Sequence, residues 1–496
     1  MPTLRPLLPF LCLCSLAFAQ EAAVAEAPAT NPIPPDIAQR IQAEGIGKSQ
    51  AMRLLRDLTG KVGHRLTGSD NFTKACNWAE AEFKAMGLKN VHQEKWGEWK
   101  LVWNRGAWIG RITNPVQIDM YVATDAWTAA TKGLQKGAFA AQPASAEELD
   151  AAALKGKWVL SKKLPRGPVR EACEGAGILG FVYRAGDPDK NFPTRVRVFG
   201  SNMTAMKPID QVPLIPQIAV QADHFDQLFE LFEAGKNPIG EFDIQNSFRD
   251  GPIELNNVIA EIPGTEKPDE VVIVCGHLDS WHQVQGTTDN GTGTTSTMEA
   301  ARILAAVGAK PKRTIRFCLW GGEEEGLLGS RGYVQQHRTE MPKVSAVFNH
   351  DTGTNWAQSL GVTAAMHEQL APVFANVSRL LTSPEPDFEG VVFELKTIPR
   401  VSGGGGSDHA SFIAAGVPGL NWGLRGRSNY FQHTWHTQWD TIDNAIEEYQ
   451  RHTSTVIAMA ALGTANLEKL LDREGVSAGG GGGGRAAQSK AFAEGW

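Results

Sequence analysis

Apolar and polar positions alternate in two ways in the second half of the chain. Runs rich in β-branched and other apolar residues at 271–276, 314–320 and 344–349 predict buried strands. The segments that separate these runs predict helices near 293–307 and 324–337. Strands and helices that alternate through short connections imply right-handed crossovers and a parallel sheet. The pattern therefore predicts an α/β fold, with a mixed, largely parallel central sheet flanked by helices.

A different pattern occupies residues 118–250. Short apolar runs such as "GILGFVY" and "VPLIPQIAV" predict strands around a single helix, "ADHFDQLFELFEAG". This stretch contains none of the acidic clusters found later in the chain, so we expect an inserted β-rich domain. The expected organisation is a signal peptide (1–19), a flexible leader (20–35), the catalytic domain in two parts (36–117 and 251–475) around the insert (118–250), and a disordered glycine-rich tail (476–496).

Composition narrows the class of protein without assigning a function. The chain has 496 residues, of which 42% are hydrophobic and 21% charged, as in soluble globular proteins. The formal net charge is −6 and no basic stripe appears, so nucleic acid is not an expected partner.

The first 19 residues have the features of a secretory signal. Arg5 precedes an apolar run, and Ala17-Phe18-Ala19 matches a small-residue cleavage site. The apolar run is shorter than the ~20 residues that span a bilayer, which argues against a membrane anchor. We therefore expect a secreted or periplasmic protein.

Cysteines are sparse for an exported protein of this size. Four remain after the signal: Cys76, Cys173, Cys275 and Cys318. We therefore expect that disulfides do not define the fold, and the sequence leaves a single bridge open.

Acidic and imidazole side chains follow several of the predicted strands. His277 and Asp279 follow the first strand, "GGEEEG" with Glu323 and Glu324 follows the second, and Asp351 follows the third. Parallel strands end on one edge of a sheet, and ligands bind in the crevice outside those ends. We therefore expect these side chains to converge, joined by His436 from a later loop.

Such a cluster favours a metal site. Crowded carboxylates at a sheet edge repel one another unless a cation compensates. Imidazole with carboxylate suits zinc, whereas carboxylates alone suit magnesium or calcium. Taken singly, each residue also has an ordinary structural interpretation: Asp289 before Asn-Gly is typical of a turn, and the glutamates are typical of a helix start. Their common placement at successive strand ends favours two zinc ions.

Several motifs occur together in one order: "GHRLTGSDNF", "GHLDSWHQVQGTTDNGTG", "TIRFCLWGGEEEGLLGSRGYV", "SDHASF" and "HTWHTQWDT". In combination they resemble the co-catalytic zinc exopeptidases that include aminopeptidase Y and carboxypeptidase Q, especially the exported bacterial members near carboxypeptidase Q. The resemblance covers most of the expected mature chain and implies the zinc-exopeptidase fold. The inserted segment resembles the protease-associated domain of that family.

The resemblance assigns metal ligands residue by residue. It implies that two zinc ions are held by five side chains, one ion by His277 and Asp351, the other by Glu324 and His436, with Asp289 bridging them. The turn after the bridging residue reads "DNGTG", where "DNAAG"-like sequences are common in relatives.

The resemblance also assigns residues around the metals. Glu323 would be the general base, because base and ligand are the first two glutamates after Gly-Gly in the family, and Glu325 would face elsewhere. Asp279 would fix the tautomer of one ligand imidazole, and Asp440 that of the other. For the substrate pocket the candidates are Asp408, His409 and Tyr430.

The implied function is hydrolysis of short peptides by a metal-bound hydroxide, with a glutamate as general base. Aminopeptidase and dipeptidase or carboxypeptidase action both stay open, because the sequence does not place the charge that would hold a substrate terminus. The alternatives are a single-zinc glutaminyl cyclase-type transferase and a non-catalytic peptide-binding relative. Peptides are the expected partners, and the resemblance also admits a homodimer.

Overall fold

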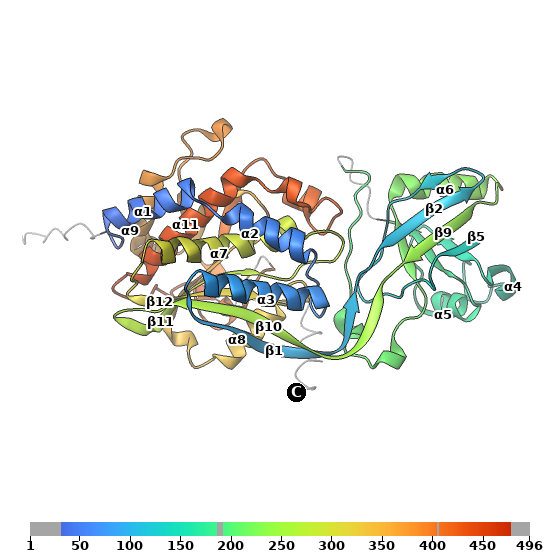
Figure 1. Cartoon of the computed structure of the whole chain (residues 1–496), viewed down its shortest axis with the longest axis horizontal. Helices are drawn as coiled ribbons and strands as arrows, with labels where there is room; N and C mark the ends of the chain where they lie inside the picture. The colour runs from blue at the N-terminus through green and yellow to red at the C-terminus, as the bar shows by residue number, and fades with distance from the viewer. Residues whose placement is uncertain (1–30, 186–191, 404–405, 478–496) are drawn as a thin grey trace, which may run out of the picture.

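The chain folds into two lobes, each built around one eight-stranded sheet (Figure 1). The computed structural model describes residues 31–185, 192–403 and 406–477. The predicted signal peptide and most of the predicted leader lie outside the described residues. Among the residues described, no helix combines the length and the apolar character needed to span a bilayer.

The central sheet of the larger lobe is mixed. Its strands lie in the spatial order β1 (Lys89–Asn104), β10 (Ser247–Ile262), β12 (Arg313–Trp320), β11 (Lys267–His277), β13 (Val344–Asn349), β17 (Gly419–Arg425), β14 (Trp356–Val362) and β15 (Glu394–Thr397). The four middle strands β12, β11, β13 and β17 are mutually parallel, whereas β1 and β10, β10 and β12, and β17 and β14 pair antiparallel. The prediction of a mixed, largely parallel sheet is confirmed.

Helices cover both faces of this sheet, as predicted. Their bounds are α1 (Pro35–Gly47), α2 (Ala51–Asp57), α3 (Asp70–Ala85), α7 (Thr292–Ala306), α8 (Leu328–Gln336), α9 (Ala364–Leu380), α10 (His409–Ala414) and α11 (Glu447–Ala465). In β11, Val272 and Val274 face the core shared with α1, α3, α7, α9 and α11. Ile273 and Cys275 face the opposite core, which α8 and α10 complete. This alternation of a strand buried on both faces explains the continuous apolar run.

Two helix boundaries differ from the sequence prediction. The helix expected near 324–337 begins only at Leu328, because residues 323–326 form a turn that places acidic side chains at the sheet edge. The helix expected at 443–471 is shorter, since α11 spans Glu447–Ala465. All four cysteines outside the predicted signal are buried and unpaired.

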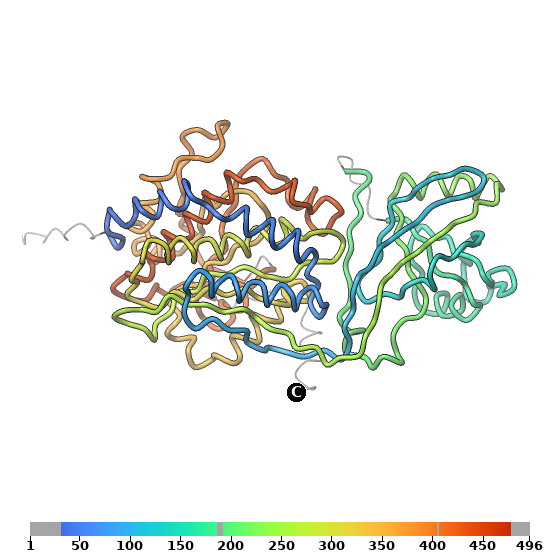
Figure 2. Tube along the Cα trace, viewed as in Figure 1, coloured from blue at the N-terminus to red at the C-terminus, as the bar shows by residue number. Residues whose placement is uncertain are grey.

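The second lobe contains the other sheet. Its strands are β2 (Trp108–Asn114), β3 (Ile118–Asp119), β4 (Val122–Ala123), β5 (Gln135–Ala141), β6 (Trp158–Ser161), β7 (Gly180–Arg184), β8 (Gln217–Val220) and β9 (Ile239–Ile244), with helices α4 (Ala151–Leu154), α5 (Gly167–Gly175) and α6 (Ala222–Glu233). A two-stranded ribbon, in which β1 leads into β2 and β9 into β10, joins the lobes (Figure 2). The likeness of this lobe to a protease-associated domain stays a prediction.

A small parallel pair lies near the end of the described chain. Strand β16 (Val401–Ser402) pairs with β18 (Val476–Ser477). The first two residues of the predicted tail are therefore strand, and the remainder of that tail lies outside the described residues.

Candidate metal centre

The carboxyl ends of neighbouring strands bring the predicted site residues together. Strand β11 ends at His277, and the turn after β12 carries Glu323 and Glu324. Asp351 lies two residues past β13, and His436 comes from the loop that follows β17. Because β12, β11 and β13 are adjacent and parallel, these groups meet at one edge of the sheet.

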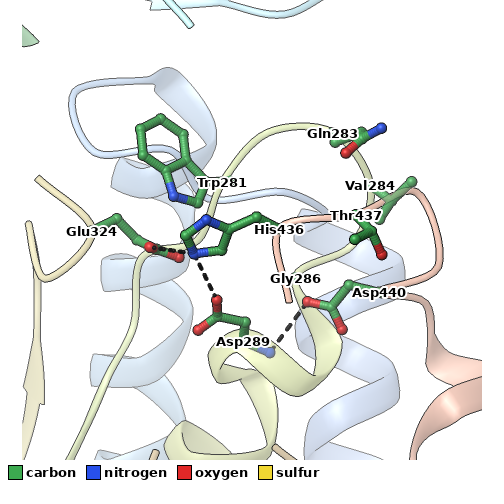
Figure 3. A pocket seen from close by; sticks show the side chains of 9 residues that line it. All are labelled: Trp281, Gln283, Val284, Gly286, Asp289, Glu324, His436, Thr437 and Asp440. Carbon is green, nitrogen blue, oxygen red and sulfur yellow. Dashed lines mark hydrogen bonds and ion pairs between the residues drawn. The ribbon is translucent and has the colours of Figure 1, made fainter. Parts of the chain in front are cut away.

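Five side chains form two overlapping groups with the spacing of metal ligands: His277, Asp289 and Asp351, and Asp289, Glu324 and His436. The Nε2 atom of His277 lies 3.3 Å from Asp289 Oδ1 and 3.7 Å from Asp351 Oδ1. The Nε2 atom of His436 lies 3.1 Å from Asp289 Oδ2 and 3.1 Å from Glu324 Oε2 (Figure 3). Asp289 thus turns one carboxylate oxygen to each group.

The chemistry of these groups fits divalent cations. Glu324 Oε1 is buried without a hydrogen-bond partner in the described part of the chain, whereas His277 Nε2 and Asp289 Oδ2 have ion-pair contacts within the cluster. Buried polar atoms without partners are costly, so a ligand is the natural partner for them. Imidazole nitrogens combined with carboxylate oxygens are a donor set that suits zinc.

The electrostatics of the two histidines support the same interpretation. Burial lowers the pKa of His436, but the carboxylates of Glu324 and Asp289 outweigh it and raise that pKa to about 9. Burial also opposes protonation of His277, yet Glu323 and other carboxylates raise its pKa well above the usual value. The carboxylates thus surround both imidazoles with negative charge, which favours binding of a cation.

Asp440 positions the shared carboxylate. Its Oδ1 accepts a hydrogen bond from the backbone N–H of Thr288 at 2.6 Å, and its Oδ2 accepts one from the N–H of Asp289 at 3.2 Å. This differs from the expected contact with an imidazole, because His436 Nδ1 has no hydrogen-bond partner among the described residues. Asp440 therefore acts on the backbone that carries Asp289.

Asp279 links a histidine to the glutamate turn. The carbonyl oxygen of Asp279 lies 3.1 Å from His277 Nδ1, and its carboxylate lies 3.7 Å from the same nitrogen. The carboxylate also accepts the backbone N–H groups of Glu323 and Glu324 at 3.3 and 3.2 Å, and the hydroxyl of Thr67 at 3.2 Å. One side chain thereby holds groups from two strand ends in register.

Glu323 lies beside the first group but outside both ligand sets. Its Oε2 is 4.0 Å from His277 Nε2. Burial, together with the negative charges of Asp351 and Glu324, raises the pKa of Glu323 well above its usual range. A carboxyl with a raised pKa next to a metal site is suited to accept and return a proton. The third glutamate, Glu325, belongs to neither group, and burial together with the neighbouring Asp279 raises its pKa.

The three predicted pocket residues occupy different places. Asp408 is fully buried, and burial raises its pKa to about 7. His409 is also buried, at the start of α10. Tyr430 is buried, and burial together with the negative charges of Asp289 and Asp351 raises its pKa well above the usual value.

A pocket of about 210 Å³ opens beside the second group (Figure 3). It is lined by Trp281, Gln283, Val284, Gly286, Asp289, Glu324, His436, Thr437 and Asp440. The lining residues include three acids and neither lysine nor arginine.

Arg65 is a functional residue that the sequence interpretation did not single out. Its buried guanidinium donates hydrogen bonds of 2.7 Å each to the carbonyls of Leu278, Gln285 and Gly286. Burial lowers the pKa of Arg65 to about 10. These bonds hold the loop between His277 and the shared aspartate. A lone arginine within the otherwise neutral run "RLTG" is the only sequence signal for this role.

Comparison with known proteins agrees with this geometry. Residues 257–461, which supply all five clustered side chains, match the model of peptidase family M28. The matched segment is thus similar in sequence to peptidase family M28. This match, together with the relatives below, confirms the prediction of a zinc-dependent metallopeptidase and the resemblance drawn from the motifs.

Relatives and solved structures extend the likeness beyond the matched segment. Carboxypeptidase Q of Mus musculus is 28% identical over 430 residues, covering 84% of this chain and 86% of that protein. Carboxypeptidase Q of Bos taurus is 26% identical over 442 residues, covering 86% and 88%. The fold is shared with a peptidase M28 precursor from Shewanella amazonensis (24% identity, TM-score 0.61, 88% of this chain and 98% of that one). A zinc aminopeptidase from Bacillus subtilis is also similar (19% identity, TM-score 0.51, 83% and 93%).

Proposed function

We propose that this protein is an exported exopeptidase that binds two zinc ions and hydrolyses the terminal peptide bonds of short peptides. The observation that carries the proposal is the shared position of Asp289, whose two oxygens face the two histidines His277 and His436. A carboxylate that bridges two metals is what two-metal hydrolytic sites require. The names of the curated relatives support peptides as the substrate class.

The residues around the site have separable roles in this reaction. Bound zinc ions would polarise the peptide carbonyl and lower the pKa of a water molecule. Glu323 accepts the proton of the attacking water and delivers it to the leaving amine, for which its raised pKa is suited. Tyr430 keeps its phenolic proton at neutral pH, because its pKa is raised, and donates it as a hydrogen bond to the developing oxyanion.

The pocket does not favour a free substrate carboxylate. Its lining has no lysine or arginine that would pair with one, and its acids are the proposed ligands Asp289 and Glu324 and the positioning residue Asp440. We therefore place aminopeptidase action first and dipeptidase or carboxypeptidase action second. A panel of dipeptides, N-blocked peptides and C-amidated peptides separates these alternatives, since an aminopeptidase cleaves the amidated peptides and spares the blocked ones.

Metal removal and reconstitution test the proposal directly. Dialysis against a chelator should abolish hydrolysis, and titration with zinc should restore it as metal content, measured by elemental analysis, reaches two ions per chain. Full activity at one ion per chain would contradict the two-metal proposal. Cyclisation of an N-terminal glutamine peptide, with no peptide-bond hydrolysis, would establish the single-zinc transferase instead. Binding of peptides without either reaction would establish a non-catalytic relative.

A further inference from the structure

A segment of the second lobe lies against the loop that carries His436. In Figure 1 this green segment, which follows the grey trace, runs between the two lobes. The N–H of Val198 donates a hydrogen bond of 3.2 Å to the carbonyl of His436 itself. The N–H of Val196 donates to Gln438 Oε1 at 2.8 Å, and the guanidinium of Arg195 donates to the carbonyl of Gln432 at 3.0 Å. The second lobe therefore contacts a proposed metal ligand through its backbone.

The same segment is fixed on its other side to its own lobe. The N–H of Phe199 donates to Asp125 Oδ1 at 3.1 Å, and its carbonyl accepts from the N–H of Ala126 at 2.8 Å. At Gly200 a Cβ atom would lie 2.7 Å from Ala126 Cβ and from the Trp127 ring, so only glycine allows this approach. Held from both sides, the backbone at Phe199 presents its side chain in one direction.

That direction is toward the site. The Phe199 ring centroid lies 5.1 Å from the His436 ring, 6.1 Å from the Trp281 ring and 6.3 Å from the Trp435 ring, edge to face in each case. Trp281 also lines the pocket beside His436 (Figure 3). Phe199 is nevertheless 43% exposed, and Phe431, whose ring is 6.1 Å from Trp435, is 56% exposed. Phe199 thus leaves part of its ring exposed beside Trp281 and His436, two residues that line the pocket.

We propose that Phe199 is a specificity-determining residue, which the second lobe contributes to bind a bulky apolar side chain of the peptide next to His436. This rests on the proposed peptidase function and adds the substrate class. The occupant is an apolar side chain because the surrounding groups are aromatic faces. The Arg197 guanidinium is placed over the Trp435 ring at 4.9 Å, and its Nη2 donates to the carbonyl of Phe431. Aromatic faces bind apolar groups through area burial and favourable ring geometry.

Steady-state kinetics on matched dipeptides test this proposal. The wild-type protein, loaded with zinc, should cleave Phe- and Leu-containing dipeptides with a higher kcat/KM than Ala-Ala and Gly-Gly. In Phe199→Ala this preference should fall at least ten-fold, mainly through KM, while kcat for Ala-Ala and the zinc content stay unchanged. Phe199→Leu should restore much of the preference. Leu134→Ala, which removes another exposed apolar side chain of the same lobe, should leave the preference unchanged.

Each failure has a distinct meaning. An equal loss of kcat/KM on all dipeptides, or loss of zinc, would overturn the specificity role and indicate that Phe199 only supports the fold. A change in molecular mass by sedimentation in Phe199→Ala, with unchanged preference, would overturn it in favour of an interface between two copies. Wild-type protein that cleaves none of the peptides would refute the proposed function itself, whereas an active wild type with an unaltered variant would refute this inference alone.

Discussion

At the scale of single residues, the site depends on buried ionisable side chains, which would be unstable without a partner. Asp289 is surrounded by two histidines, and its pKa is lowered because both imidazoles outweigh the effect of burial. Glu323 lies in the same crevice with Oε2 4.0 Å from His277 Nε2, but burial and the charges of Asp351 and Glu324 outweigh that imidazole and raise its pKa. The carboxyl groups of Asp289 and Glu323, which lie in the same crevice, thereby differ in proton affinity. A lowered pKa suits a metal ligand, whereas a raised pKa suits a group that carries a proton.

Replacing Glu323 with glutamine should separate catalysis from metal binding. The amide cannot accept the proton of the attacking water, so we expect kcat to fall by at least 100-fold. The zinc content should stay at two ions per chain, because this residue belongs to neither ligand group. Peptide hydrolysis and elemental analysis on the same preparation check both parts, and retained turnover would refute the base assignment.

Replacing Arg65 tests the loop between β11 and the shared aspartate. Arg65→Met keeps the apolar stem but leaves the carbonyls of Leu278, Gln285 and Gly286 without their donor. We expect a loss of about 3 kcal/mol in the free energy of unfolding, measured in urea, since buried polar groups without partners are costly. A matched control is Arg53→Met, at an exposed ion pair with Glu82, which should cost less than about 1 kcal/mol.

At the scale of elements, the site is assembled where several strands and one loop end. The parallel register places His277 opposite Trp320, so the turns that follow β11 and β12 begin at the same level of the sheet. Asp279 then binds the glutamate turn, and Asp440 binds the turn before α7. The elements are thus joined by carboxylates that accept backbone N–H groups. Each such bond fixes the main chain that carries a ligand.

Asp440→Ala should therefore weaken metal binding from outside the ligand set. The N–H groups of Thr288 and Asp289 would lose their acceptor, and the shared carboxylate would lose its fixed position. Partners of this kind contribute about 10–100-fold to metal affinity. Competition with a chromophoric zinc chelator measures that change. Asp440→Asn keeps one acceptor oxygen and should show a smaller loss, whereas equal affinity in all three proteins would contradict the positioning role.

At the scale of the whole molecule, the two lobes meet over polar and aromatic groups beside the site. His282, from the larger lobe, is fully buried between the rings of Trp103 and Trp108, and its Nε2 lies 2.9 Å from the carbonyl of Thr124 in the second lobe. Burial lowers the pKa of His282 to about 3. The junction therefore requires a neutral imidazole.

This junction should make the protein sensitive to acid. The pKa of His282 in the folded state lies below the ordinary value of 6.5, so only the unfolded state binds its proton between pH 6.5 and about 3. The stabilisation is complete above pH 6.5 and decreases as the pH falls. At pH 5 the expected loss from this residue is about 2 kcal/mol, measured by urea unfolding at pH 7.5 and 5.0. His282→Gln keeps a donor for Thr124 without titrating, and should reduce the difference between the two pH values by that amount.

The sequence alone determined the type of fold, because strand and helix periods are local properties and parallel strands must end on one edge. For the same reason it predicted that His277, Glu324 and Asp351 would meet, whereas the choice among the three glutamates came from the resemblance to the family. The ends of helices were predicted less accurately. Helix α8 begins later than expected, because the backbone of the turn at 323–326 is bound by Asp279, 44 positions earlier.

Only the tertiary structure decided the contacts that join distant segments. The partner of Asp440 is the backbone at 288–289, and the carbonyls that Arg65 binds lie more than 200 residues later. The approach of Phe199 to His436 depends on how the two lobes pack. Side-chain and backbone partners of this kind have no periodic pattern in the sequence, because they follow from the relative placement of whole elements, which packing of the two cores determines.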